Sequence, residues 1–166
     1  MVVMPVQGIT QGTQPIMSYN FGAKNFQRVR QVFKRLLTVT MTVTITAFII
    51  VSLFPGQLAQ IFNDDQELVA LVDRVMPVFF AGIWAFGAQM ACQTTFMALG
   101  QAKTSLFLAL LRKVILLVPL AILLPRITNS VMGVYIAEPV ADILASATTL
   151  TIFLTRRKKL LPTPKD

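Results

Sequence analysis

Two long runs without any charged residue, residues 36–63 and 75–102, restrict this chain more than any other feature of its sequence. Each run exceeds the ~20 residues that cross the hydrocarbon core of a bilayer as a helix. Charged residues make up 13% of the chain, whereas a soluble domain carries roughly 25%. Because so few charges cannot cover a soluble surface, we expect an all-α, polytopic membrane protein.

Five hydrophobic segments define a membrane domain over residues 1–155, followed by a basic tail over residues 156–166. The expected spans are about 1–22, 36–57, 74–99, 103–125 and 130–155. Residues 38–46 alternate threonine with apolar residues, which is a strand-like period. Since the uncharged run continues without a turn, a helix is favoured there, with hydroxyls bonding back to the preceding turn. We expect Asp64 to cap the helix of the third span, with Glu67 three residues later.

Along the chain, connections that are rich in basic residues alternate with connections that are poor in them. Besides the tail, two regions are rich in Lys and Arg. One is the first connection, and the other is the third connection together with the start of the segment that follows it. Together with the tail they hold all but two of the 15 Lys and Arg residues. The positive-inside rule therefore places them, and the C-terminus, in the cytoplasm, with the chain in the cell (inner) membrane.

Five spans with a cytoplasmic tail leave the N-terminus outside, and residues 1–23 lack the positive region of a secretory signal. We interpret the chain as the C-terminal part of a longer transport-type protein. The alternative is a complete small protein whose first helix has its N-terminus outside.

The net charge of +8 does not indicate nucleic-acid binding, because the bases lie in blocks between apolar runs rather than on a soluble face with stacking aromatics. The chain has no histidine and a single cysteine, Cys92. It shows no nucleophile triad, phosphate loop or metal cluster. We therefore expect neither an enzyme nor a bound cofactor.

Polar residues spaced four, three and four apart form one stripe on the first segment: Gln7, Gln11, Gln14 and Ser18. Such a stripe cannot face lipid, where unpaired polar groups are costly, so it must face another helix or a water-filled cavity. Gly8 and Gly12 lie beside it at a spacing that permits close helix packing. Hydrogen bonding between helices without any ligand remains an equal alternative.

The first segment ends in Asn-Phe-Gly-Ala, and we expect Gly22 to take the left-handed capping conformation there. The basic run after it predicts a separate helix at the cytoplasmic membrane surface. The apolar side of that helix is Phe26, Val29, Phe33 and Leu36.

The carboxylates inside a predicted span are Glu138 and Asp142, which share one face of the last segment at i, i+4. A carboxylate within a bilayer is costly and suggests a functional group, here one that takes up a proton or a cation. The alternatives are that Glu138 reaches the interface and that Asp142 pairs with Arg112 or caps a turn broken by proline. We interpret Arg112 as a structural or pairing residue. Gln89 and Gln93 form a further polar pair. Together with Gln11 and Gln14 this pair would line a cleft, and the alternative is that it takes part only in ordinary packing between helices.

The stretch QGTQPIMSYNFGAKNFQRVR resembles the Q-x-x-x-P-I-x-x-x-N-x-G-A signature of the multidrug and toxic compound extrusion family. The stretches LAQIFNDDQELVALV, FMALGQAKTSLFLALLRKVILLVPLAILLP and GVYIAEPVAD are similar to that family in the same order. The resemblance implies a transporter of twelve helices in two lobes, of which this chain supplies helices eight to twelve. It also implies a missing N-terminal lobe as partner, and small organic substrates, amphipathic and often cationic. These would be exported across the lipid bilayer in exchange for H⁺ or Na⁺ by alternating access.

The chain departs from the family in its length and in its tenth helix, where residues 75–100 contain no carboxylate. Two alternatives to an exporter remain. A lipid-linked oligosaccharide flippase has a similar architecture, but its cavity needs several cations for pyrophosphate, and only Arg112 and Lys113 are available. An inert truncated membrane product is the other alternative.

Overall fold

The computed structural model describes residues 3–62 and 65–161 of the chain. Within these ranges every regular element is a helix. In chain order the helices are α1 (Val3–Gly22), α2 (Phe26–Leu53), α3 (Pro55–Gln60), α4 (Gln66–Phe79), the 3₁₀ turn η1 (Phe80–Gly82), α5 (Ile83–Ala98), α6 (Ala102–Leu110), the π-helical segment η2 (Leu111–Leu117), α7 (Val118–Thr128) and α8 (Met132–Leu160).

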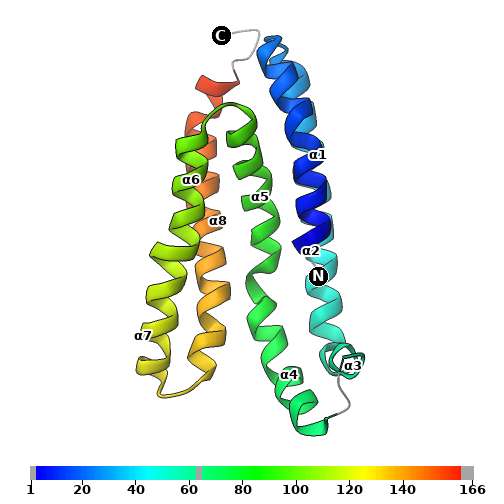
Figure 1. Ribbon diagram of the computed structural model, residues 1–166, viewed down its shortest axis with the longest axis vertical. Coiled ribbons are helices and arrows are strands. Elements are labelled where there is room, and N and C mark those ends of the chain that lie inside the picture. The colour runs from blue at the N-terminus through cyan, green and yellow to red at the C-terminus, as the bar shows by residue number, and fades with distance from the viewer. Residues whose placement is uncertain (1–2, 63–64, 162–166) are drawn as a thin grey trace.

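The helices form an elongated bundle in which α4, η1 and α5 follow one another as one rod and α6, η2 and α7 as another (Figure 1). Helix α5 contacts α1, α2 and α8, and α8 also contacts η2 and α7. Among the described residues, four stretches are long and apolar enough to cross a membrane: Phe26–Leu53, Gln66–Ala98, Ala102–Thr128 and Met132–Arg156. The glutamine-bearing α1 is not one of them. The prediction of an all-α polytopic membrane protein is confirmed.

Helix α2 is continuous from Phe26 to Leu53, so the prediction of a separate surface helix before the second span is wrong. No proline or glycine interrupts these residues, and the helix ends just before Pro55, which disfavours a helical conformation in the residue preceding it. Val29 and Leu36 pack in the protein interior instead of against lipid.

Hydroxyls of the threonine-rich run bond back within α2, as the sequence predicts. Thr42 Oγ1 donates to the Thr38 carbonyl at 2.9 Å, and Thr44 Oγ1 donates to the Thr40 carbonyl at 2.9 Å. These bonds satisfy the hydroxyls inside the helix, so the run needs no neighbouring strand.

Two predicted helix caps are displaced in the structure. Gly22 is the last residue of α1, and Lys24, with φ of 56°, takes the left-handed conformation after it. Asp64 lies outside the described residues, and Asp65 caps α4, its Oδ1 accepting a bond from the Glu67 N–H at 3.0 Å.

Glycines fix the closest approaches between helices. A Cβ placed on Gly87 would lie 2.9 Å from the Thr40 carbonyl oxygen of α2, and one on Gly133 would lie 2.6 Å from the Leu124 carbonyl carbon of α7. In contrast, Gly8 and Gly12 have no other atom within 4 Å of such a Cβ. The prediction of close packing at these two glycines is therefore wrong for the described chain.

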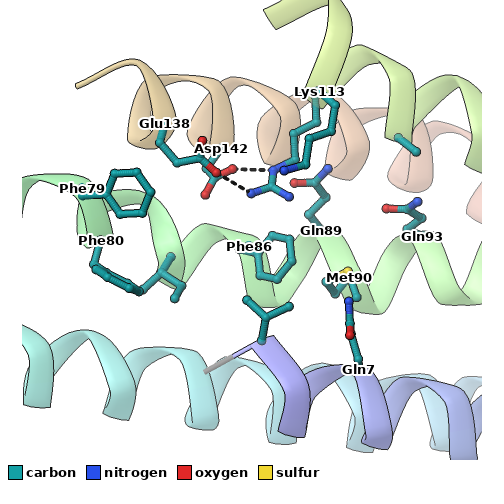
Figure 2. A pocket seen from close by; sticks show the side chains of 14 residues that line it. Gln7, Phe79, Phe80, Phe86, Gln89, Met90, Gln93, Lys113, Glu138 and Asp142 are labelled. Carbon is teal, nitrogen blue, oxygen red and sulfur yellow. Dashed lines mark hydrogen bonds and ion pairs between the residues drawn. The ribbon is translucent and has the colours of Figure 1, made fainter. Parts of the chain in front are cut away.

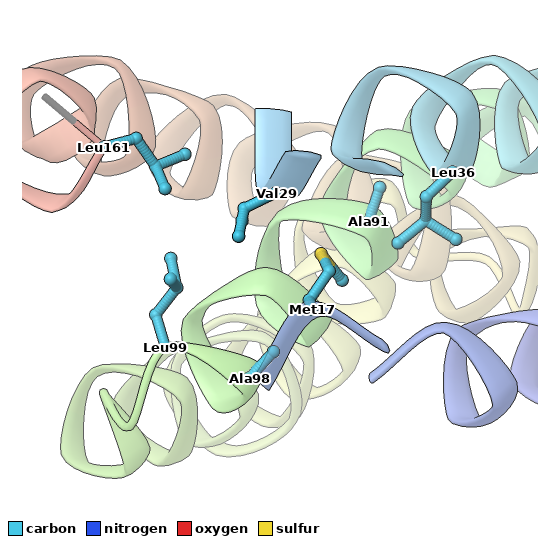
Figure 3. Packing of buried hydrophobic residues seen from close by; sticks show 7 residues of the cluster. All are labelled: Met17, Val29, Leu36, Ala91, Ala98, Leu99 and Leu161. Carbon is cyan, nitrogen blue, oxygen red and sulfur yellow. The ribbon is translucent and has the colours of Figure 1, made fainter. Parts of the chain in front are cut away.

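One hydrophobic cluster joins the two ends of the sequence (Figure 3). It comprises Met17, Val29, Leu36, Ala91, Ala98, Leu99 and Leu161. Beside it, the Phe153 ring of α8 stacks on Phe33 and meets Phe96 edge to face. Burial of these side chains holds α1, α2, α5 and the end of α8 together.

Candidate functional site

A cavity of about 520 Å³ lies among α1, the α4–η1–α5 rod, the α6–η2 segment and α8 (Figure 2). Its wall combines aromatic and aliphatic side chains with polar and charged ones. The lining residues are Val3, Gln7, Phe79, Phe80, Ile83, Phe86, Gln89, Met90, Gln93, Ala109, Arg112, Lys113, Glu138 and Asp142. An apolar wall with a few convergent polar groups is the usual composition of a small-molecule site.

Arg112 ion-pairs with both carboxylates of α8. Its Nε lies 2.5 Å from Asp142 Oδ1, and its Nη2 lies 3.3 Å from Glu138 Oε1. The side chains are 15% exposed for Arg112, 21% for Glu138 and 7% for Asp142. Asp142 is thus the tightly held and buried acid, whereas Glu138 is held more loosely and is more accessible from the cavity.

The guanidinium of Arg112 also lies over an aromatic ring, with its carbon 4.5 Å from the centroid of Phe86. A cation over a ring face is stabilised by the ring quadrupole. One guanidinium therefore satisfies two acids and an aromatic face at once, which is a way to hold a charge inside a membrane protein.

The π-helical segment η2 supplies Arg112 and Lys113, both of which line the cavity. Pro119 follows this segment and has no N–H to donate to the preceding turn, which favours a break in α-helical bonding here. Single π-turns occur often at functional sites.

Close packing at Gly82 positions the acids of α8. A Cβ on Gly82 would lie 2.7 Å from the Pro139 Cα and 3.0 Å from the Asp142 Cβ. Because η1 carries glycine at this point, α8 approaches the α4–α5 rod closely enough for its acids to face the cavity.

Gln89 is the most buried polar residue of the cavity wall, with 1% of its surface exposed. Its Oε1 has no hydrogen-bond partner, one of two such buried side-chain atoms within the described ranges. Gln93 lies one turn further along α5 and is half-buried (Figure 2).

The structure brings together six of the residues singled out from the sequence: Gln7, Gln89, Gln93, Arg112, Glu138 and Asp142. Gln11 and Gln14 do not line the cavity, Gln11 being exposed and Gln14 half-buried. Gln7 is the member of the stripe that reaches the cavity, while Ser18 Oγ donates to the Ala98 carbonyl at 3.0 Å.

Sequence reasoning named Lys113 only as a cation available to a flippase cavity, and it missed Phe79 as a lining residue. The charge of Lys113 within an apolar run was a signal that could have found it.

A second, more open hollow of about 580 Å³ lies between α3 and α4. Glutamines 57, 60 and 66 and Asp73 line it. Among its lining residues Asp73 is the sole charged one, and no ion pair is formed there.

The sequence profile of the MatE family matches residues 1–123. The chain is 24% identical over 160 residues to the multidrug export protein MepA of Staphylococcus aureus strain N315, covering 95% of this chain and 35% of that protein. MepA of Staphylococcus saprophyticus is 24% identical over 153 residues, covering 91% and 33%. The chain therefore spans about a third of the length of these relatives.

Solved structures show the same arrangement of helices. The MATE multidrug transporter DinF-BH is 34% identical, with a TM-score of 0.87 over 96% of this chain and 35% of that one. A MATE structure in the straight conformation is 17% identical, with a TM-score of 0.89 over 98% of this chain and 36% of that one, and supports the fold alone.

Proposed function

The chain belongs to the MatE family, and on that premise we propose that it forms most of one lobe of a multidrug efflux antiporter in the cell membrane. The exported compounds are amphipathic, often cationic, organic molecules. The chain's own sequence, its family and the four stretches of the described residues that are long and apolar enough to cross a membrane support a membrane transporter rather than an enzyme.

The observation that carries this proposal is the shared ion pair in the cavity, in which two carboxylates of one membrane helix hold a single guanidinium. Arg112, Glu138 and Asp142 carry one net negative charge as a group. A cation that enters the cavity competes with Arg112 for an acid. Glu138 is the acid that exchanges, because its contact is longer and its side chain more exposed than that of Asp142.

Exchange at Glu138 supplies a coupling mechanism. Protonation or Na⁺ binding at Glu138 releases one contact of Arg112, and a cationic substrate does the same from the cavity side. Two ligands that compete for one acid give exchange, provided that each favours a different access state. The alternating states arise from movement of this lobe against its partner lobe around the cavity.

The partner in this proposal is the remainder of the same transporter, since the matched relatives are about three times longer than this chain. We place the C-terminus in the cytoplasm on the basis of the alternating charge of the connections. A flippase for pyrophosphate-linked lipids is less well supported, because Arg112 is already neutralised by two acids.

The test uses the full-length transporter that contains this chain, reconstituted into proteoliposomes with an imposed pH or Na⁺ gradient. We expect Glu138→Gln to abolish gradient-driven ethidium transport, while Glu67→Gln, an exposed acid outside the cavity, leaves it unchanged. Gradient-driven transport that persists at the original rate in Glu138→Gln would show that this acid does not couple the exchange.

A further inference from the structure

The first turns of α2 carry a positive charge that the described chain does not neutralise. Lys24, Arg28, Lys34 and Arg35 are all exposed there. Residues 1–63 contain no Asp or Glu, and the two ion pairs of the described residues do not involve these four cations. Their charge is therefore balanced from elsewhere, either by solvent ions or by a bound anion.

Two further cations at the same end of the bundle are used within the fold. Arg30 Nη1 donates to the Leu161 carbonyl at 3.4 Å, and Arg156 Nη1 donates to Thr104 Oγ1 at 3.0 Å. These contacts tie the starts of α2 and α6 to the end of α8, which lie at one end of the bundle (Figure 1). The exposed cations of α2 make no comparable contact with the described residues and stay available to an outside partner.

The length of α2 places its cations in the headgroup layer of the membrane. The helix has 28 residues, which extend about 42 Å at ~1.5 Å per residue, whereas the hydrocarbon core is about 30 Å thick. Residues 36–53 carry no charge and extend about 27 Å, so they fill the core. Arg35 then lies at the boundary of the core, and Arg28 lies about two helical turns further out.

Three polar residues form a basic stripe on α2, namely Arg28, Gln31 and Arg35, all of them exposed. At ~100° per residue they lie within about 60° of one another around the helix. The buried Val29 and Leu36 lie on another side of α2 and pack into the bundle. The two guanidinium groups therefore project from one outer face into the same headgroup layer.

The surface below the basic stripe suits acyl chains. On the membrane side of Arg35 the exposed residues on this face are Thr38, Thr42, Ile45 and Ile49. The two threonine hydroxyls donate to carbonyls of the preceding turn, at 3.0 Å for Thr38 and 2.9 Å for Thr42. Because these hydroxyls are already satisfied, the surface presents methyl and methylene groups. A soluble anion would use the cations alone, whereas a phospholipid uses both parts of the face.

We propose that this face of α2 binds an anionic phospholipid, whose phosphate contacts Arg28 and Arg35 and whose acyl chains lie along Thr38, Thr42 and Ile45. Guanidinium groups bind phosphate oxygens through paired, charge-assisted hydrogen bonds. Basic residues at the edge of a membrane span attract anionic lipids. The site lies outside the cavity, so the inference goes beyond the proposed export function and does not depend on it.

The test measures which lipid lies next to this face. The full-length transporter that contains this chain carries a fluorophore on Thr42→Cys, with other accessible cysteines replaced by serine; Cys92 is fully buried and stays. In nanodiscs, quenching by nitroxide-labelled phosphatidylglycerol and by nitroxide-labelled phosphatidylcholine is titrated separately. The ratio of the two association constants gives the local lipid preference. We expect phosphatidylglycerol to be favoured about fivefold.

Paired variants assign this preference to the two arginines. Arg28→Gln with Arg35→Gln removes the charge and should lower the ratio to about one. Arg28→Lys with Arg35→Lys keeps the charge and should hold the ratio within about twofold of the original. Arg74→Gln with Arg126→Gln is the matched control, because these arginines are exposed on α4 and α7 and lie outside the basic stripe. It should leave the ratio unchanged.

A ratio of one in the original protein overturns the inference. So does a preference that survives in Arg28→Gln with Arg35→Gln, because other groups would then produce it. A second measurement needs no variant: 1 M NaCl shortens the Debye length to about 3 Å and should lower the original ratio toward one. A ratio that salt does not change also contradicts a site built on these charges. Since both leaflets of a nanodisc have the same composition, the result does not depend on the orientation of the chain.

Discussion

Arg112 and Asp142 lie 30 positions apart in the sequence and form an ion pair with 2.5 Å between Nε and Oδ1. The pair joins the π-helical segment η2 to α8 across the cavity wall. Of the two ion pairs that Arg112 forms with the described residues, it has the shorter distance between nitrogen and oxygen.

The strength of this pair predicts an unequal effect of neutralising the two acids. Asp142→Asn leaves the guanidinium of Arg112 without its main partner, and we expect it to lower the free energy of unfolding by about 3 kcal/mol. Glu138→Gln costs about 1 kcal/mol, because that contact is longer and more exposed. Thermal unfolding in detergent, followed by size-exclusion chromatography, measures both. Equal losses would contradict the ranking.

A control for this prediction removes the whole network. Replacing Arg112 by Met, Asp142 by Leu and Glu138 by Gln leaves no buried charge unpaired. Apolar replacement of a buried ion pair is often neutral or stabilising. We therefore expect the triple variant to recover most of the stability lost in Asp142→Asn.

Gly82 predicts a second effect on stability. Gly82→Ala places a methyl group within 2.7 Å of the Pro139 backbone, so α8 must move away from η1. Overpacking of this kind costs about 1–3 kcal/mol. Gly8→Ala is the matched control, since nothing lies within 4 Å of its added Cβ. The melting temperatures of the two variants measure the difference, and a Gly82→Ala chain as stable as Gly8→Ala would show that this contact is not tight.

The orientation in the membrane is tested by cysteine labelling in intact cells. We expect Gln57→Cys to react with an impermeant maleimide from outside and Lys103→Cys to react only after the membrane is opened. Both residues are exposed, Gln57 in α3 and Lys103 in the first turn of α6, and these two parts of the chain lie at opposite ends of the bundle (Figure 1). The native Cys92 is fully buried and serves as an internal unreactive control. The reverse pattern would invert the topology.

The length of the chain relative to its relatives predicts that it does not transport alone. Expressed by itself, the chain should give cells no resistance to ethidium, because alternating access requires a second lobe to move against. The full-length protein that contains it should give resistance under the same promoter. Membrane fractions probed with an antibody to the tail verify equal expression. Clear efflux by the chain alone would mean that it forms a complete transporter, for example as a dimer in which a second copy takes the place of the other lobe.

The sequence predicted the all-helical membrane fold because that fold depends on composition along the chain. Runs of residues without charge must lie in lipid, and in lipid a backbone without strand partners must be helical. The same reasoning applied to residues 38–46, where the uninterrupted apolar run was decisive and the alternation of threonine was not.

The sequence also predicted the pairing of groups within one helix. Glu138 with Asp142 and Gln89 with Gln93 are each four residues apart, and that spacing places them on one face whatever the tertiary structure is. Both pairs line the cavity. Which helix supplies their partners is not a property of spacing. The sequence offered the pairing of Asp142 with Arg112 as one alternative, and the packing of η2 against α8 decides for it.

Local hydropathy and the helical period are enough to say which segments are helices in a bilayer and which of their faces are polar. The rotation of each helix about its own axis depends instead on tertiary packing. At ~100° per residue, Gln11 and Gln14 lie roughly 60–120° around α1 from the face of Val6, Thr10 and Met17 that packs into the bundle. Side-chain packing against α2 and α5 sets that rotation, and it depends on residues distant in the chain.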